Sequence, residues 1–233
     1  MNRENSLKST VGRRERKKAE TAQRIAAASR KLLRSKGFEA LTTQEVAIEA
    51  GIPPGTLFGY ITSKTDLLIV ALVHEAIEFV GTIAPRIPSE EKFLDRVQFV
   101  FEEMAVYHGR DLEVTRHFLR ELGIARNPNL RGLASSLGDA VRKVVAALID
   151  DEQSAGRITA ALPAEKISRF LFAHYWQSLR LWISGTGTRQ DFTTTLREAL
   201  RWQIAGLKPA RAKAKMLEKT VVANKARKAA RKG

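Results

Sequence analysis

The residues near the start of the chain with the clearest chemical use are five basic side chains between positions 13 and 18. They are Arg13, Arg14, Arg16, Lys17 and Lys18. Guanidinium and ammonium groups donate hydrogen bonds and carry positive charge, which is the chemistry that binds phosphate oxygens. The run leads directly into a helical pattern. Its position therefore favours contact with a nucleic-acid backbone over a purely solubilising role.

No pattern in the sequence indicates a catalytic or metal-binding centre. The four histidines lack the paired spacing of metal ligands, and His74-Glu75 does not continue into a zinc-helix motif. Gly185-Thr186-Gly187 has no strand before it, so it is a turn and not a phosphate-binding loop. The chain has no cysteine, which excludes disulfides and thiolate chemistry. We expect no enzyme activity, no metal and no cofactor.

The positive charge of the chain is concentrated at its two ends. Of the formal net charge of +15, residues 1–18 contribute +5 and residues 206–233 contribute +9, so the body is close to neutral. The C-terminal run of Lys, Arg and Ala can bury very little. It predicts a disordered tail that either improves solubility or contacts phosphate, and we expect residues 1–18 to form a flexible arm.

The N-terminus has no apolar core, and no uninterrupted apolar stretch approaches the roughly 18 residues of a membrane-spanning helix. We therefore expect a soluble, unprocessed protein of the bacterial cytoplasm, with no membrane partner.

Helix-start and helix-stop signals divide the N-terminal quarter into short helices. After a first amphipathic helix, Thr42 can cap a second one and Glu45 can complete a capping box. This helix must end near Gly51, because Pro53 and Pro54 forbid its continuation, and a third short helix follows. Two short helices around a tight glycine turn are typical of a helix-turn-helix.

Helical patterns continue from Ala84 onward, separated by prolines and glycines, without a convincing pair of strands. The predicted fold class is therefore all-α, with about nine helices. Pro163 opens a helix that is apolar nearly all round, which predicts cover on two sides. The last helix begins at Thr188, with Asp191 three residues later in a second capping box. We expect these two helices to form an interface pair.

A dense set of short motifs spans residues 25–68. In order, these are Gly37-Phe38, Thr42, Val46-Ala47, Ala50-Gly51, Gly55-Thr56-Leu57, Tyr60 and Ser63-Lys64. The segment resembles the DNA-binding domain of the TetR (tetracycline-repressor-like) family, and the rest of the chain resembles that family only by its helix pattern. The resemblance implies a three-helix, helix-turn-helix DNA-binding domain over residues 19–66. A helical effector-binding and dimerisation domain would follow over residues 67–205, before the basic tail.

The resemblance also implies which residues contact DNA. Thr42 would bind phosphate through its hydroxyl and backbone amide, and Gln44 would pair with adenine. Phe58 either touches a thymine methyl group or lies in the core. The implied DNA-binding residues are Lys17, Lys18, Thr42, Thr43, Gln44, Pro54, Gly55, Thr56, Phe58, Gly59, Tyr60 and Lys64.

The sequence departs from the family at Pro53 and Pro54, where a serine or threonine and then a polar or charged residue are common. Pro53 cannot cap the recognition helix. Tyrosine and histidine are common in the family where this chain has Phe58 and Gly59. Two hydrogen-bonding contacts to DNA are therefore missing here. We therefore predict a sparse base readout that relies on Gln44, Thr56 and DNA shape.

In the family, the C-terminal domain dimerises through its last two helices and holds a ligand that changes the separation of the DNA-binding heads. The implied dimer-interface residues are Phe170, His174, Leu179, Trp182, Phe192, Leu196 and Leu200. Side chains on the central helices suit an unknown small apolar or amphipathic effector, with plain core packing as the alternative. They are Phe101, Met104, Tyr107, His108, His117, Phe118, Tyr175 and Trp176.

These features predict a ligand-responsive transcription regulator. We expect a repressor that binds a pseudo-palindromic double-stranded DNA operator as a homodimer and is released by the effector; activation is the alternative sign of regulation. A different class is a sequence-tolerant, nucleoid-like DNA-binding protein dominated by its basic tails. Deletion of residues 206–233 would remove nearly all affinity from that protein, but little specific binding from a regulator. An enzyme would need turnover that survives Tyr60→Ala and Lys64→Ala.

Overall fold

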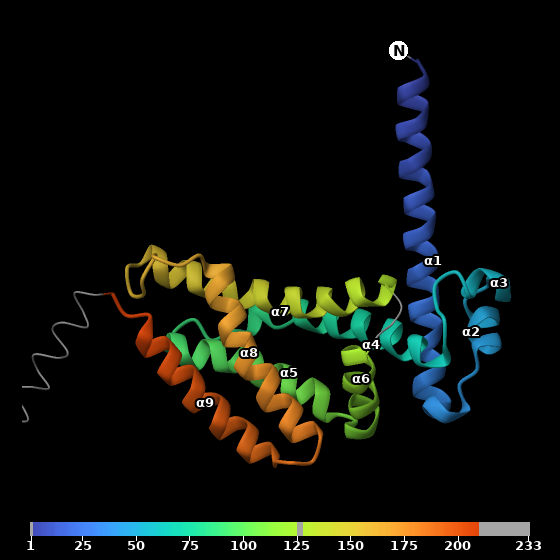
Figure 1. Ribbon diagram of the computed structural model, residues 1–233. Coiled ribbons are helices and arrows are strands. Elements are labelled where there is room, and N and C mark those ends of the chain that lie inside the picture. Colours follow the sequence, from blue (N-terminus) through green and yellow to red (C-terminus); the bar gives the residue numbers. More distant parts are fainter. Residues whose placement is uncertain (1, 125–127, 210–233) are drawn as a thin grey trace, which may run out of the picture. The chain divides into compact units, whose positions relative to one another are not determined.

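Every regular element in the described part of the chain is helical. The computed structural model describes residues 2–124 and 128–209, which contain nine α-helices, one short 3-10 helix and no strand (Figure 1). The prediction of an all-α fold with about nine helices is confirmed. The elements are α1 (Asn2–Ala40), α2 (Thr43–Glu49), α3 (Pro54–Leu57), α4 (Lys64–Gly81), η1 (Ala84–Arg86), α5 (Phe93–Gly109), α6 (Leu112–Ile124), α7 (Pro128–Ser154), α8 (Ala164–Ile183) and α9 (Arg189–Gly206).

The chain divides into two compact units, and the first carries the helix-turn-helix. It comprises Met1–Thr82 and Tyr107–Ala140. Within it α1 packs on α4 and α2, α2 packs on α3, and α4 also contacts α6. Lys64–Arg86 is long and apolar enough to cross a membrane, but half of that apolar stretch is buried inside the protein. This is the burial expected of a core helix, and it explains why α4 is so apolar.

The basic N-terminal arm is part of α1. This helix begins at Asn2, and its helical backbone is interrupted at Gly37, where φ is 76° and ψ is 173°. The predicted disordered C-terminal tail falls mainly on residues 210–233, which lie outside the described residues.

The second unit comprises Ile83–Val106 and Val141–Gly233, and in it α8 packs against α9. The ring of Phe101 stacks on that of Tyr175 with centroids 4.7 Å apart, and Phe192 meets Tyr175 edge-on at 6.2 Å. Thr188 begins α9 with the predicted capping box. Its hydroxyl accepts a hydrogen bond from the Asp191 amide at 3.0 Å, and its own amide donates to Asp191 Oδ2 at 2.8 Å.

Candidate nucleic-acid interface

The first turn of α2 is held by the other predicted capping box. Thr42 Oγ1 accepts a hydrogen bond from the Glu45 amide at 3.2 Å, and the Thr42 amide donates to Glu45 Oε2 at 3.2 Å. The ammonium of Lys36 lies 2.5 Å from the other carboxylate oxygen. The hydrogen bonds from Lys36 and Thr42 hold the pKa of Glu45 below its ordinary value. Thr42 is therefore a helix cap, and it lies on the exposed surface of the unit.

The turn between α2 and α3 depends on the left-handed backbone of Gly51, whose φ is 60°. The Gly51 amide donates to Ile48 O at 2.9 Å, and the Ile52 amide reaches back to Ala47 O at 3.0 Å. These two bonds satisfy carbonyl groups at the end of α2 and turn the chain toward α3.

The single turn of α3 presents most of its side chains to solvent. Pro53 provides no side-chain cap, as predicted, and the turn is closed by a 2.9 Å hydrogen bond from the Thr56 amide to Pro53 O. Leu57 is fully buried and fixes the helix to its neighbours. Phe58 is 58% exposed, so the core alternative for this residue is wrong. An exposed aromatic ring beside Thr56 leaves this face of α3 available to a partner.

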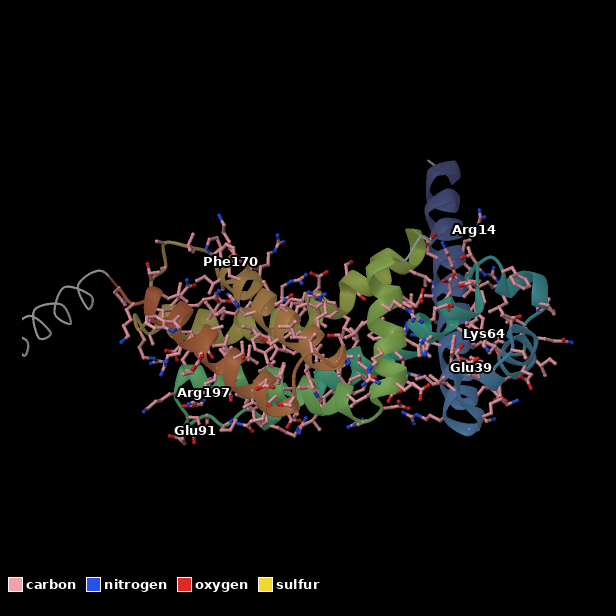
Figure 2. The ribbon with its side chains drawn as sticks, turned by 60° about the horizontal axis from the view of Figure 1, so that its bottom comes forward. Arg14, Glu39, Lys64, Glu91, Phe170 and Arg197 are labelled. Atoms are coloured by element: carbon pink, nitrogen blue, oxygen red, sulfur yellow. The ribbon has the colours of Figure 1, made fainter. Side chains whose placement is uncertain are left out.

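The two predicted phosphate-binding residues after α3 are both tied to α1. Tyr60 is half-buried and its hydroxyl donates to the carbonyl oxygen of Lys18 at 3.4 Å. Lys64 Nζ donates to Glu39 O at 2.7 Å and lies 4.8 Å from the centre of the Phe38 ring; Figure 2 shows Lys64 beside Glu39. These contacts position both side chains at the rim of the helix-turn-helix.

The other predicted DNA-binding residues belong to the same unit. Thr43 is half-buried, and the exposed ones are Lys17, Lys18, Gln44, Pro54, Gly55, Thr56 and Gly59.

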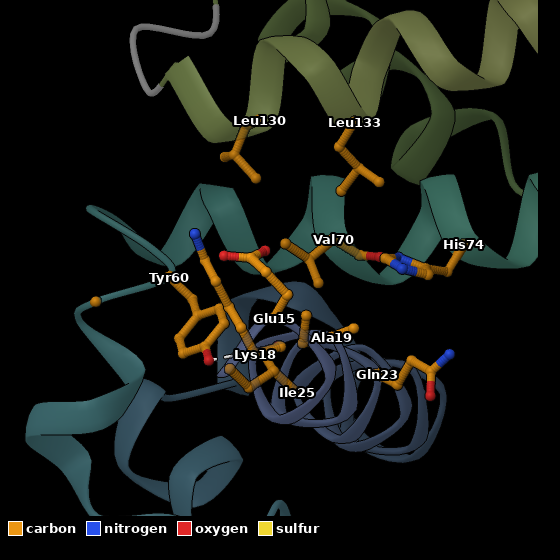
Figure 3. A pocket seen from close by; sticks show the side chains of 12 residues that line it. Glu15, Lys18, Ala19, Gln23, Ile25, Tyr60, Val70, His74, Leu130 and Leu133 are labelled. Atoms are coloured by element: carbon orange, nitrogen blue, oxygen red, sulfur yellow. Dashed lines mark hydrogen bonds between the residues drawn. The ribbon is translucent and has the colours of Figure 1, made fainter. Parts of the chain in front are cut away.

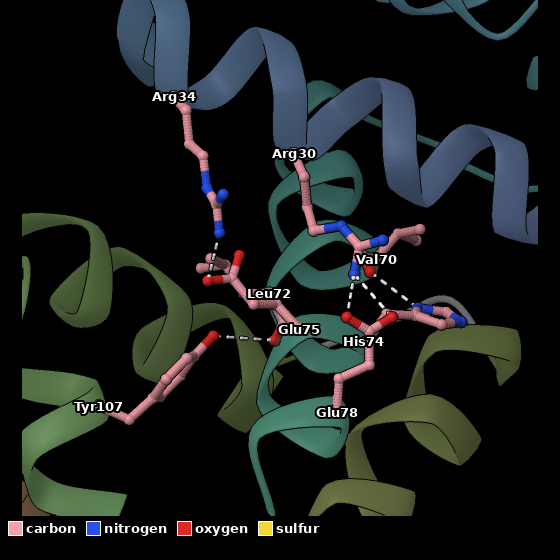
Figure 4. Close-up of polar contacts among 8 residues, drawn as sticks. All are labelled: Arg30, Arg34, Val70, Leu72, His74, Glu75, Glu78 and Tyr107. Atoms are coloured by element: carbon pink, nitrogen blue, oxygen red, sulfur yellow. Dashed lines mark hydrogen bonds and ion pairs between the residues drawn. The ribbon is translucent and has the colours of Figure 1, made fainter. Parts of the chain in front are cut away.

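Two ion pairs join α1 to α4. Arg30 Nη1 lies 3.2 Å from both carboxylate oxygens of Glu78, and Arg34 Nη2 lies 2.7 Å from Glu75 Oε1 (Figure 4). The sequence pattern alone did not indicate these four residues. The available signal was the two glutamates, three positions apart on an otherwise apolar helix, which require partners on a neighbouring element.

A cavity of about 430 Å³ opens beside these ion pairs, between α1, α4, α6 and the end of α5. Three of the predicted effector-binding residues line it: Tyr107, His108 and Phe118. Arg110 also lines it, with its guanidinium 5.1 Å from the centre of the Phe79 ring and 5.4 Å from that of Tyr107. Four more charged side chains that the sequence pattern did not indicate also line it: Arg30, Arg34, Glu75 and Asp111.

The two neighbouring aromatic residues of this cavity have shifted pKa values. Burial lowers the pKa of His108 to about 4, so the ring is neutral near pH 7. Burial raises the pKa of Tyr107, and the carboxylate of Glu75 raises it further. The Tyr107 hydroxyl donates to Leu72 O at 3.4 Å. The wall formed by Tyr107 and His108 is therefore uncharged. The guanidinium groups of Arg30, Arg34 and Arg110 supply the positive charge of the cavity.

The remaining predicted effector-binding residues lie elsewhere. His117 is half-buried, with its ring centroid 5.9 Å from that of Phe38, and does not line the cavity. Phe101, Met104 and Tyr175 are buried in the second unit, where core packing accounts for them. Trp176 belongs to the same unit and is half-buried.

Four of the seven predicted dimer-interface residues are buried inside the protomer. Each of the four is at most 2% exposed, so it has no surface left to bury against a second copy. That part of the prediction is wrong, and these residues are core: Leu179, Phe192, Leu196 and Leu200.

Other side chains of α8 and α9 are open to solvent. Phe170 is 52% exposed, His174 is also exposed, and Trp182 is half-buried. Leu181 and Trp202, which were not among the predicted interface residues, are 40% and 74% exposed. Large apolar side chains exposed on two adjacent helices are typical of an interaction surface.

Across residues 2–124 and 128–209, no group of three or more His, Asp or Glu side chains is arranged to hold a metal ion.

Residues 25–71 match the family model described as bacterial regulatory proteins, tetR family. No curated protein sequence matches the chain. Among solved structures, FadR of Thermus thermophilus is a TetR-family transcriptional repressor in complex with lauroyl-CoA. It is 22% identical to this chain, and the match covers 78% of this chain and 93% of FadR with a TM-score of 0.57. GusR of Salmonella enterica is 25% identical, with coverage of 79% and 95% and a TM-score of 0.51. FadR of Bacillus subtilis in complex with stearoyl-CoA is 16% identical, with coverage of 79% and 98% and a TM-score of 0.53.

Proposed function

We propose that this chain, whose residues 25–71 match the tetR family model, is a cytoplasmic repressor that binds a pseudo-palindromic operator as a homodimer. One observation carries the proposal. The α3 turn is exposed on its outer face and anchored on its inner face by the fully buried Leu57. A helix supported in this way can enter a major groove without unfolding its own domain.

The DNA contacts in this proposal divide into two kinds. Gln44, Thr56 and Phe58 face solvent and have the chemistry for base edges, with an amide for adenine and a ring for the thymine methyl group. The hydroxyl and amide groups of Thr42, with Tyr60, would bind phosphate and set the register. The other contacts in the proposal are Lys17, Lys18, Thr43, Pro54, Gly55, Gly59 and Lys64.

Dimerisation would use the exposed side of α8 and α9. Phe170, Leu181 and Trp202 present apolar surface there, in place of the four buried residues predicted from the sequence. A two-fold axis through this surface would repeat the DNA-binding head. The two recognition helices must then lie about 34 to 36 Å apart to read successive turns of one face of the duplex.

We propose that the 430 Å³ cavity of the first unit binds the effector. Its apolar wall and its guanidinium groups suit an amphipathic molecule with an anionic group. An anion that takes Arg34 from Glu75, or Arg30 from Glu78, would weaken the ion pairs between α1 and α4. Since α1 also packs on α2, this would alter the support of the helix-turn-helix. Acyl-CoA is bound in both FadR structures, so acyl thioesters and free fatty acids form the first set of ligands to test.

Selection of bound fragments from random DNA tests the proposal. A regulator should enrich an inverted repeat, and the Phe58→Ala variant should weaken binding to that repeat by about tenfold without lowering stability, because the ring is exposed. Absence of any enriched repeat contradicts the proposal. Deletion of residues 206–233 then tests the nucleoid-like alternative, which predicts loss of nearly all affinity and a much shallower dependence on salt.

A further inference from the structure

A second cavity lies within the first unit, against the DNA-binding residues themselves. It has a volume of about 410 Å³ and opens between α1, the turn after α3, α4 and the first turns of α7 (Figure 3). This volume falls within the range of roughly 300 to 1,000 Å³ that is usual for small-molecule sites. It shares no lining residue with the 430 Å³ cavity, so the two are distinct.

The lining of this second cavity is apolar in the middle and polar at its ends. Ile25, Val70 and Leu130 are buried residues of three different helices that meet there. Figure 3 shows Lys18, Glu15 and Tyr60 at one end of the cavity and His74 at the other. An apolar centre between polar ends suits a ring system with a polar group, not a fully apolar ligand.

The polar ends define the ligand further. Glu15 lines the same end of the cavity, but none of the ion pairs between described residues involves Lys18, so its ammonium is available to an anion. His74 Nδ1 donates a hydrogen bond to Val70 O at 2.9 Å, so Nε2 is the ring nitrogen left for a ligand. The site therefore offers a cation beside a carboxylate at one end and an imidazole nitrogen at the other.

We propose that this cavity is a small-molecule site for an apolar ring system with one anionic group, separate from the effector cavity. Its occupant would draw the Lys18 ammonium and the Tyr60 ring inward, away from phosphate, so that ligand and operator oppose one another. The opposition between ligand and operator rests on the proposed function, whereas the existence of the site does not. By thermodynamic linkage, operator DNA must lower the affinity for the ligand by the same factor as the ligand lowers the affinity for the operator.

The fluorescent probe 1-anilinonaphthalene-8-sulfonate has the required rings and anion, and its binding is measured first without DNA. Ala22→Leu fills the cavity from α1, and Ala27→Leu makes the same change on the same helix outside it. We expect Ala22→Leu to weaken probe binding about tenfold and Ala27→Leu to leave it unchanged. Equal binding by the wild type and both variants would overturn the site.

A second pair of variants covers the case in which Ala22→Leu disturbs the fold. Lys18→Gln removes the cation of the cavity, and Lys17→Gln removes an exposed cation that does not line it. Lys18→Gln should lower the affinity for the sulfonate probe by roughly threefold to tenfold, and Lys17→Gln should leave this affinity unchanged. Equal affinity in this pair also overturns the site.

The last step adds the selected operator fragment to the probe titration. If the operator lowers the affinity for the probe and the probe lowers the affinity for the operator, ligand and operator oppose one another. An unchanged affinity for the probe overturns this opposition. If no operator is found, the proposed function fails, but the probe titrations without DNA still decide whether the site exists.

Discussion

Arg24 of α1 donates a 2.6 Å hydrogen bond to the carbonyl oxygen of Gly51, the residue that turns the chain from α2 to α3. The two residues are 27 positions apart, so this bond fixes the turn to a helix outside the helix-turn-helix. A Cβ atom added at Gly51 would lie 2.8 Å from Arg24 Nη2. The position of the recognition helix therefore depends on a glycine for its backbone conformation and for this close approach.

Gly51→Ala should destabilise the protein by about 1 to 2 kcal/mol, because an alanine is strained at positive φ and its methyl group displaces the Arg24 side chain. Urea unfolding measures the loss. Gly132→Ala is the matched control, since this helical glycine has open space around the added Cβ and should gain up to about 1 kcal/mol. Equal effects of the two substitutions would show that the turn does not require Gly51.

Variants of the two capping boxes distinguish an effect on stability from an effect on DNA binding. Thr42→Ala and Thr188→Ala each remove a threonine cap with an acidic partner three residues later, so each should cost about 1 kcal/mol in thermal unfolding. Only Thr42 lies in the helix-turn-helix. We expect Thr42→Ala to weaken operator binding in mobility shifts, and Thr188→Ala to leave it unchanged. A similar loss of DNA binding in both variants would contradict the assigned interface.

Both capping boxes and the glycine turn could be predicted from the sequence because each is a local feature. A cap joins residues three positions apart, and positive φ favours glycine at any turn of this kind. The exposure of Phe58 could not be predicted, because an aromatic residue in a short helix has the same pattern whether it faces the core or a partner. Only the position of neighbouring elements decides between them.

The same limit explains the errors on α8 and α9. An apolar helix with cover on two sides has one face that packs in its own protomer and another that packs on a partner. The periodicity of the sequence does not distinguish the core-facing side from the partner-facing side. Leu179 and Leu196 are both fully buried in the protomer, whereas Leu181 and Trp202 are exposed. The charged wall of the effector cavity was missed for a related reason, since Arg34 and Glu75 meet only through tertiary packing.

His108 should make stability depend on pH. Its pKa is about 4 in the folded protein, against 6.5 for an ordinary histidine, because burial disfavours the charged ring. Between these values the unfolded chain binds a proton that the folded protein does not. Stability should therefore be highest above pH 6.5 and fall by up to about 3 kcal/mol as the pH drops to 4.

His108→Leu removes this titration and tests its origin. Urea unfolding at several pH values from 4.5 to 7 should give a much flatter profile for the variant than for the wild type. Carboxylates with lowered pKa values, such as Glu152 and Asp191, remain in both proteins and still reduce stability at lower pH. Parallel profiles for the two proteins over this range would mean that His108 is not the source of the dependence.

Charge on the exposed side of α8 and α9 should abolish dimerisation. Leu181→Glu and Trp202→Glu place a carboxylate on side chains that are 40% and 74% exposed, so the fold of each protomer should be kept, with stability changed by less than about 1 kcal/mol. In a dimer these positions would be buried, and an unpaired charge there is strongly unfavourable. Ile48→Glu is the control, since Ile48 is 71% exposed but lies on α2. Sedimentation should give monomers for the first two variants and dimers for the wild type and Ile48→Glu. A dimeric Trp202→Glu variant would move the interface to another surface, and a monomeric wild type would remove the two-fold operator from the proposal.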